Sequence, residues 1–356
     1  MKSKNTLIFT INIIMLVLVS FISLLFGSKI LNITDVFNAI FNNSTSKYSF
    51  IIFEYRIPRL LICIMVGMSL AVAGAIFQGV LRNALASTDV LGIGKGAGFF
   101  ACMAISLGLK EPISLWAMVG GLLAGTIIYI LTKKTNFKNT SIVIMGIAIS
   151  ALFDAGIQYL NISNSENIQT ILLWLTGSVW GRYWNEVKVL TPYVVIFIPL
   201  AIVLAHKVDI LSLGDNIAIN LGEKVSLLKV GLLLIGIILT TSSVSVSGTI
   251  GFVGLVAPHI AKNLVGYKHI LVIPLSEWPF RRSLKMHLII LACWDRTSKL
   301  SPSSFTLSHL GHDRVRSFPL VSASSLFFCH TARIRLDFIS LSSLARCAIK
   351  IALIRT

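Results

Sequence analysis

The sequence predicts an all-α protein, a bundle of helices that crosses a membrane several times. Hydrophobic residues make up 55% of the 356 positions and charged residues only 13%, whereas soluble domains carry about 25% charged residues. The mean hydropathy of +0.84 is correspondingly high. Apolar runs about long enough to cross the ~30 Å hydrocarbon core of a bilayer recur along the chain. They fall at residues 6–27, 60–81, 93–109, 113–132, 140–162, 189–206 and 226–247.

The first apolar run and a later, shorter one need a different interpretation. Residues 6–27 resemble a signal peptide, but the run is long, no clean A-x-A cleavage site follows and more spans come after it. We therefore expect a first membrane helix. The shorter run at 251–265 contains Pro258, which interrupts helical hydrogen bonding, so a short or broken helix is expected there. Another apolar start follows at 269–275.

The net charge of +17 is typical of lysines and arginines held on the cytoplasmic side of a membrane, and it does not require a nucleic-acid partner. Basic loops at 132–138, 206–216 and 222–229 are therefore expected to be cytoplasmic. Counting spans from these loops places the N-terminus inside and the loops at 28–55 and 163–188 outside. The five cysteines form no C-x-x-C pair, so neither a disulfide framework nor a metal site is expected.

Arg56 and Arg59 interrupt this charge pattern, because they fall at the outer end of the second expected span. Arginine side chains at a membrane surface extend their charged groups towards water, which accounts for the position without any function. The alternative is a docking site for an acidic partner outside. Position alone favours the first interpretation.

The stretch RNALASTDVLGIGKGAGFF, residues 82–100, places several glycines around Lys95. A phosphate-binding P-loop requires a serine or threonine directly after the lysine, and a dinucleotide fingerprint requires a preceding strand. Gly96 follows Lys95 and no strand is expected, which argues against a nucleotide. Small residues instead let helices approach closely in a membrane. We expect a tight helical hairpin, its turn at the cytoplasmic face, that uses Gly74, Gln78, Asn83, Asp89, Gly92 and Gly96.

Four separated segments resemble, in order and spacing, the FecCD family of membrane permeases. They are YRIPRLL (55–61), GMSLAVAGAIFQGVLRNALASTDVLGIGKGAG (67–98), LSLGDNIAINLG (211–222) and GTIGFVGLVAPHIAKNLVG (248–266). Members of this family serve ABC importers for iron–siderophore complexes, haem and vitamin B12. The resemblance covers roughly residues 1–276.

The resemblance implies a helix bundle of the type II ABC importer permease kind, with about eight of ten expected spans present. It implies a multi-pass subunit of the plasma membrane that is not an enzyme and holds no cofactor or metal, because separate ATPase subunits hydrolyse the ATP. The other implied partners are an extracytoplasmic siderophore-binding protein, a second permease and the lipid bilayer. An iron(III)–siderophore complex is the leading expectation for the substrate, with haem and cobalamin as alternatives.

The resemblance also implies two sets of partner-binding residues. In the family, arginines of an R-x-P-R motif pair with acidic residues of the binding protein, which favours docking for Arg56 and Arg59. Residues 211–222 are similar to the coupling segment, a pair of short cytoplasmic helices in a groove of the ATPase; an ordinary amphipathic loop is the alternative. The coupling set comprises four residues that can form one apolar face, two glycines that can end short helices, and an aspartate: Leu213, Ile217, Ala218, Leu221, Gly214, Gly222 and Asp215.

Asp154 lies midway along the fifth expected span. A carboxylate within a membrane is costly and should face protein or a water-filled cavity. The resemblance places this span along the translocation pathway, so we hypothesise that Asp154 and Gln158, one helical turn apart, line it and contact a polar substrate. The alternative for Asp154 itself is a structural hydrogen bond between helices. The alternative for the protein is a secondary transporter that uses Asp154.

Residues 277–356 differ in character from the rest of the chain. They hold 12 Lys and Arg and 4 Asp and Glu in 80 positions. The family would continue with two more spans joined by an E-L-P-x-G motif, which this segment lacks. We therefore interpret 277–356 as a non-family tail, arising either from divergence or from out-of-frame translation. In the second case the permease is non-functional as written.

Overall fold

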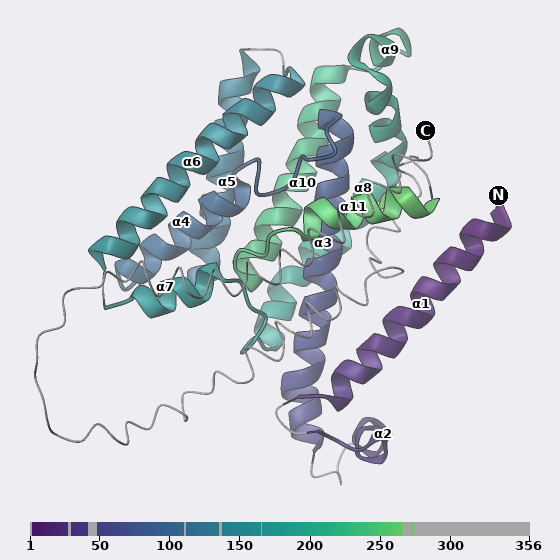
Figure 1. Cartoon of the computed structure of the whole chain (residues 1–356), viewed down its shortest axis with the longest axis vertical. Coiled ribbons are helices and arrows are strands. Elements are labelled where there is room, and N and C mark those ends of the chain that lie inside the picture. The colour runs from purple at the N-terminus through teal and green to yellow at the C-terminus, as the bar shows by residue number, and fades with distance from the viewer. Residues whose placement is uncertain are drawn as a thin grey trace, which may run out of the picture. The chain divides into compact units, whose positions relative to one another are not determined.

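The computed structural model describes residues 2–27, 30–41, 48–109, 112–134, 137–164, 166–265, 269 and 272–273, which all belong to the compact unit Met1–Ser301. Within these residues every regular element is a helix, which confirms the predicted all-α class (Figure 1). The tail at 277–356 and most of the apolar start at 269–275 lie outside the described residues. The helices are α1 (Lys2–Leu25), α2 (Ile33–Phe41), η1 (Ile51–Arg56), α3 (Ile57–Leu81), α4 (Ile93–Ser106), α5 (Ile113–Lys133), α6 (Asn139–Ser163), α7 (Ile168–Leu175), α8 (Trp184–Leu213), α9 (Asp215–Asn220), α10 (Val225–Ser247) and α11 (Val253–Val265).

Every apolar run in the sequence up to residue 265 corresponds to a helix of the structure. Among the described residues, five helical segments are long and apolar enough to cross a membrane, namely η1 continued by α3, α5, α6, α8 and α10. Residues Thr10–Leu25 of α1 and all of α4 form shorter apolar helices. α11 is also short and contains Pro258. The described residues therefore form a polytopic membrane bundle.

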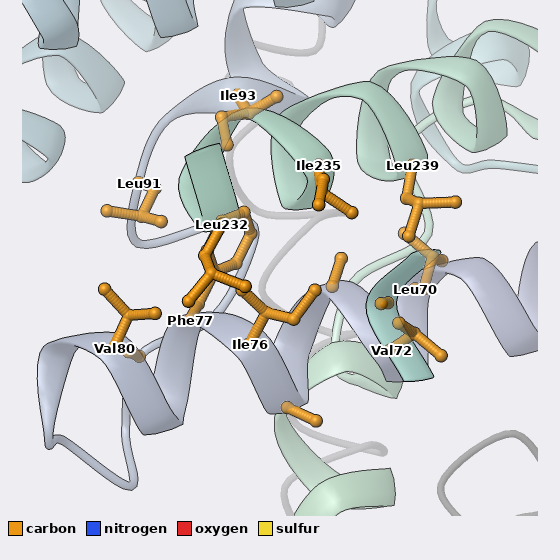
Figure 2. Packing of buried hydrophobic residues seen from close by; sticks show 14 of the residues in the cluster. Leu70, Val72, Ile76, Phe77, Val80, Leu91, Ile93, Leu232, Ile235 and Leu239 are labelled. Carbon is orange, nitrogen blue, oxygen red and sulfur yellow. The ribbon is translucent and has the colours of Figure 1, made fainter. Parts of the chain in front are cut away.

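α3 is the most enclosed of the candidate spans. Every residue from Ser69 to Leu81 is buried, because α8, α10 and α11 all pack against this helix. Close packing of side chains supplies the attraction between such helices in a membrane, where lipid tails are as apolar as leucine. Figure 2 shows this contact between α3 and α10, with the start of α4 beside it; the labelled residues are Leu70, Val72, Ile76, Phe77, Val80, Leu91, Ile93, Leu232, Ile235 and Leu239.

Two faces of α5 carry glycines, and each face meets a different helix. A Cβ added at Gly120 would lie 2.4 Å from the carbonyl oxygen of Gly96 in α4. One added at Gly121 would lie 2.6 Å from Oγ1 of Thr241 in α10. Neither position has room for a side chain, so the backbones approach closely, as small residues permit in membrane proteins. α5 thereby holds α4 against α10.

α8 extends beyond both ends of the apolar run at 189–206 that predicts it. At its start, the Glu186 carboxylate accepts a hydrogen bond from the backbone N–H of Tyr183 (2.9 Å), which is half of a capping box. At its end the helix stops before Gly214, whose φ of 129° favours glycine. The polar turns at the two ends lower the hydropathy, so the run underestimates the length of the helix.

Candidate functional site

The segment between α3 and α4, residues 82–92, turns back into the bundle. Gly92 has a φ of 71°, and a Cβ added there would lie 2.9 Å from the backbone nitrogen of Ser150 in α6. The hydroxyl of Ser150 donates to the carbonyl oxygen of Asp89 (3.4 Å). Because Ser150 lies near the middle of α6, α4 begins at about that depth. The turn expected at the cytoplasmic face starts at Arg82 but continues inside the protein.

The structure differs from the expected tight hairpin, because α3 and α4 pack mainly against other helices. Gly74 of α3 lies against α11, where an added Cβ would be 1.8 Å from the carbonyl oxygen of Gly254. In an α-helix this carbonyl would accept a hydrogen bond from the N–H of the residue four positions later. That residue is Pro258, which has no N–H. The close approach of Gly74 therefore occurs where α11 has lost a hydrogen bond.

Two more residues assigned to the hairpin make contacts of other kinds. The side-chain amide of Gln78 donates to the carbonyl oxygen of Leu255 (3.1 Å) and its oxygen accepts from Nζ of Lys262 (3.0 Å), so it fastens α11 to α3. Oδ1 of Asn83 accepts from the backbone N–H of Leu85 (2.9 Å). This contact from an asparagine to the residue two positions on stabilises a turn.

Asp89 lies between the N-terminal ends of two short helices. A Cβ added at Gly94, in the first turn of α4, would be 3.3 Å from one carboxylate oxygen. One added at Gly251, just before α11, would be 2.7 Å from the other. The backbone N–H of Phe252 donates to the same carboxylate. A negative charge is favourable beside helix N-termini, so Asp89 holds the starts of α4 and α11 together inside the bundle.

Lys95 and Asp154 form an ion pair close to this point, with 2.7 Å between Nζ and Oδ1. Their side chains are 38% and 40% exposed. Gln158, one turn further along α6, is also exposed. The glycines around Lys95 drew attention to it only as a phosphate ligand, and its pairing with Asp154 was not predicted from the sequence. The pairing could have been predicted from the two opposite charges in separate apolar runs, because each charge is costly in a membrane without a partner.

The predicted coupling segment contains one separate helix and not a pair. α8 continues to Leu213, and α9 follows directly after Gly214. Ala218 is buried, whereas Leu213, Ile217 and Leu221 are exposed. The four apolar residues therefore do not share one face as expected: Ala218 contacts the bundle and the three larger side chains point away from it. The expected first short helix is the end of α8.

Gly222 closes α9 with a left-handed turn, at a φ of 84°. Its N–H donates to the carbonyl oxygen of Ile219 (2.9 Å), and the N–H of Glu223 donates to that of Ala218 (3.0 Å). Glycine is favoured at such a helix end because it has no Cβ to oppose the conformation.

Asp215, the first residue of α9, joins two cations from other helices. One carboxylate oxygen lies 3.1 Å from Nη2 of Arg82, and the other lies 2.8 Å from Nζ of Lys229 in α10. Lys229 is only 1% exposed. Its ammonium also donates to Oδ1 of Asn139 (2.7 Å) and to the carbonyl oxygen of Phe137 (3.3 Å), so all three of its protons have acceptors. The sequence did not predict that Arg82 and Lys229 share a partner, because the two residues lie far apart in the chain, in different segments.

Two further contacts lie at the same end of the bundle. Lys207 of α8 forms an ion pair with Glu223, just after α9. The Asp209 carboxylate of α8 accepts from the backbone N–H of His269 (2.6 Å) and lies 2.8 Å from its Nδ1. Burial lowers the pKa of the His269 imidazole below its ordinary value, while the hydrogen bond to Asp209 acts in the opposite direction.

Arg56 and Arg59 occupy different surroundings, although the sequence grouped them. Arg56 is only 6% exposed, and its guanidinium donates to the carbonyl oxygens of Leu24 and Leu25, the second at 3.2 Å. These carbonyls lie at the end of α1, where a helix leaves acceptors free and favours a cation. Arg59 is partly buried one turn further on. The burial of Arg56 contradicts a surface for docking at that residue, whereas the position of Arg59 does not.

This membrane bundle has short helices that begin in its interior, charges at mid-depth, and a short exposed helix, α9, at one end. That is the architecture of a transport permease. The chain belongs to the FecCD transport family, whose model matches residues 15–278. It is therefore a multi-pass membrane protein of the permease class.

Individual relatives agree with this assignment. Over 233 residues the chain is 41% identical to the Fe(3+)-citrate import system permease protein YfmE of Bacillus subtilis (strain 168), covering 65% of this chain and 70% of the relative. Over 233 residues it is 37% identical to the Fe(3+) dicitrate transport system permease protein FecD of Escherichia coli (strain K12), covering 65% and 73%. A metal-chelate type ABC transporter solved in an inward-facing conformation matches with a TM-score of 0.71 and 25% identity, over 83% of this chain and 91% of the other. The chain is a permease of the ABC importer type.

Proposed function

We propose that the chain is the permease subunit that carries an iron(III) chelate of the citrate or siderophore class across the plasma membrane. The relatives named above are permeases for iron(III) citrate and iron(III) dicitrate, which supports this substrate over haem or cobalamin. ATP is hydrolysed by partner ATPase subunits, and this chain performs no covalent chemistry.

The Lys95–Asp154 ion pair is the observation that carries the proposed pathway. It lies near the middle of α6, yet both side chains are more than a third exposed in the single chain. Charges at this depth do not face lipid tails, because they would lose their hydration without compensation. This face of α4 and α6 is therefore directed to a second permease or to water. Asp154, Gln158 and Lys95 then line the route of a polar, charged chelate.

The two ends of the bundle suit different partners. Leu213, Ile217 and Leu221 expose apolar side chains beside α9, and we assign this surface to the groove of an ATPase. At the opposite end, Arg59 is the candidate for the binding protein. An Arg59→Glu variant should weaken docking of the binding protein while leaving the permease intact, whereas an Arg56→Glu variant should disturb the end of α1 instead.

Residues 277–356 are proposed to lie outside the permease domain, as a divergent or out-of-frame segment. Resequencing the gene across codons 260–290 tests this idea directly. A second reading frame that encodes two apolar spans would show that the tail replaces the remaining permease helices. A sound frame without such spans would show a genuine variant, and the divergent-tail interpretation would stand.

The function is tested by reconstituting the tagged chain with its co-purifying ATPase and binding protein in liposomes. Uptake of radiolabelled iron(III) citrate should require ATP and stop when the ATPase carries a disabled nucleotide site. Uptake that continues without ATP and collapses with an ionophore would replace the proposal with secondary transport through Asp154. Transport of haem or cobalamin in preference to the iron chelate would correct the substrate.

A further inference from the structure

We propose that Asp215 is a positioning residue that links the movement of α9 to the membrane bundle through Arg82 and Lys229. The inference rests on the proposed function, which places α9 in the surface that binds the ATPase and moves with it. It adds what the family resemblance does not supply, namely the contacts by which a displacement of α9 reaches the spans.

Asp215 is the only residue of α9 with ion pairs among the described residues, and these pairs join it to separate parts of the bundle. Arg82 caps the C-terminal end of α3, with a left-handed φ of 52°. Lys229 belongs to α10 and also holds Asn139, at the start of α6. A single carboxylate therefore ties α9 to α3 and α10 directly, and to α6 through one lysine.

The burial of Lys229 makes this cluster different from an ordinary surface ion pair. Exposed pairs contribute little, because water and salt screen their charges. The Lys229 ammonium is almost fully enclosed, and Asp215 is its one anionic partner among the described residues. A buried cation that loses its counter-charge is strongly unfavourable, so Lys229 and Asp215 are expected to move together.

Arg82 leads from this cluster to the interior of the bundle. It is the first residue of the 82–92 segment, which ends at the start of α4 and carries Asp89 to the start of α11. α4 in turn presents Lys95 to Asp154. A shift of α9 that pulls on Arg82 thus acts on the segment that positions the mid-depth charges.

The test uses the complete reconstituted transporter with the double variant Asp215→Asn/Lys229→Met, which removes both charges and leaves no buried cation unpaired. The matched control is Lys207→Met/Glu223→Gln, a separate ion pair beside the same helix, whereas Arg82 and Lys229 pair with Asp215. Three quantities are measured: the amount of ATPase that co-purifies, the rate of ATP hydrolysis, and the uptake of radiolabelled iron(III) citrate.

We expect the Asp215 double variant to retain its ATPase and to hydrolyse ATP, while the iron taken up per ATP falls by about tenfold. The control pair should keep the wild-type ratio. A further Arg82→Gln variant should lower the same ratio, and combining it with the double variant should add little, because both changes break one chain of contacts.

An uptake-to-hydrolysis ratio equal to wild type in the Asp215 double variant would overturn the inference, as would an equal fall in the control pair. Loss of the co-purifying ATPase in the Asp215 variant alone would also overturn it, because the residue would then serve binding of the partner. Failure of the wild-type complex to bind an ATPase or to transport would instead contradict the proposed function.

Discussion

Two charge clusters of this permease, one at mid-depth and one at the end of the bundle beside α9, are built in opposite ways. Beside α9, Lys229 is 1% exposed and has an acceptor for every proton. At mid-depth, Lys95 and Asp154 satisfy each other but are 38% and 40% exposed. The first cluster is closed within one chain, whereas the second presents its charges to whatever covers the face of α4 and α6.

This difference separates a cluster that stabilises the bundle from one that can contact the substrate. A closed cluster stabilises the arrangement of helices, and its loss should appear first in stability. An open cluster within a membrane is costly unless water or protein covers it, which is why we propose that it lines the transport route. Single variants of the two clusters should therefore differ in stability, because only the closed cluster leaves a buried charge unpaired when one partner is removed.

The largest effect is expected for Asp215→Asn, which leaves the buried Lys229 without a counter-charge. Removing one partner of a buried pair costs roughly 3–5 kcal/mol; since Asp215 is itself 35% exposed, we expect about 3 kcal/mol, the lower end. Thermal unfolding of the purified permease measures this loss. Adding Lys229→Met should restore most of the stability, and a single variant as stable as wild type would contradict a closed cluster.

Asp154→Asn should reduce uptake of the iron chelate by about tenfold, corresponding to the loss of one charge-assisted contact. Its amount in the membrane should stay close to wild type, because the pair is partly exposed. Thr126→Val is a suitable control, since Thr126 is exposed on α5 and its hydroxyl donates only within its own helix, to Leu122. Unchanged uptake by Asp154→Asn would assign the pair to the structure of the bundle.

Replacing the whole mid-depth pair sharpens the same distinction. The double variant Lys95→Met/Asp154→Leu should differ in unfolding free energy by no more than about 1 kcal/mol, because apolar residues can replace an ion pair with little penalty. Uptake should remain as low as in the single Asp154 variant. Recovery of uptake would mean that only the imbalance of charge, and not contact with the substrate, impairs the single variant.

The smallest effect is expected for Glu223→Gln, just after α9. Its partner Lys207 is 40% exposed, and exposed pairs contribute about 0.2–1 kcal/mol. The loss of stability, measured by thermal unfolding, should lie within that range, and uptake should stay within about twofold of wild type. A loss as large as that of Asp215→Asn would show that partial exposure does not distinguish the two kinds of cluster.

Hydropathy predicted the positions of the helices well, because each apolar run up to residue 265 corresponds to a helix, although only five of the helical segments are long enough to be candidate spans among the described residues. It could not predict where 82–92 goes: Gly92 indicates a left-handed turn or a close contact, but not that the contact is with Ser150. Likewise, Gly120 and Gly121 of α5 indicate close helix contacts because glycine is small. Which helices they contact depends on how the whole bundle packs. Arg56 shows the opposite case: the sequence suggested a surface residue, whereas in the structure its side chain is buried and caps the end of α1.

The mid-depth start of α4 also constrains how the protein is made. A non-helical segment such as 82–92 cannot rest in hydrocarbon with its N–H and C=O groups unpaired. Its contacts include Ser150 of α6 and Phe252 before α11, which the ribosome adds much later. Membrane insertion of this chain therefore cannot proceed to completion one helix after another. The 82–92 segment reaches its final depth only after α11 has been synthesised, so biogenesis finishes in the interior of the bundle.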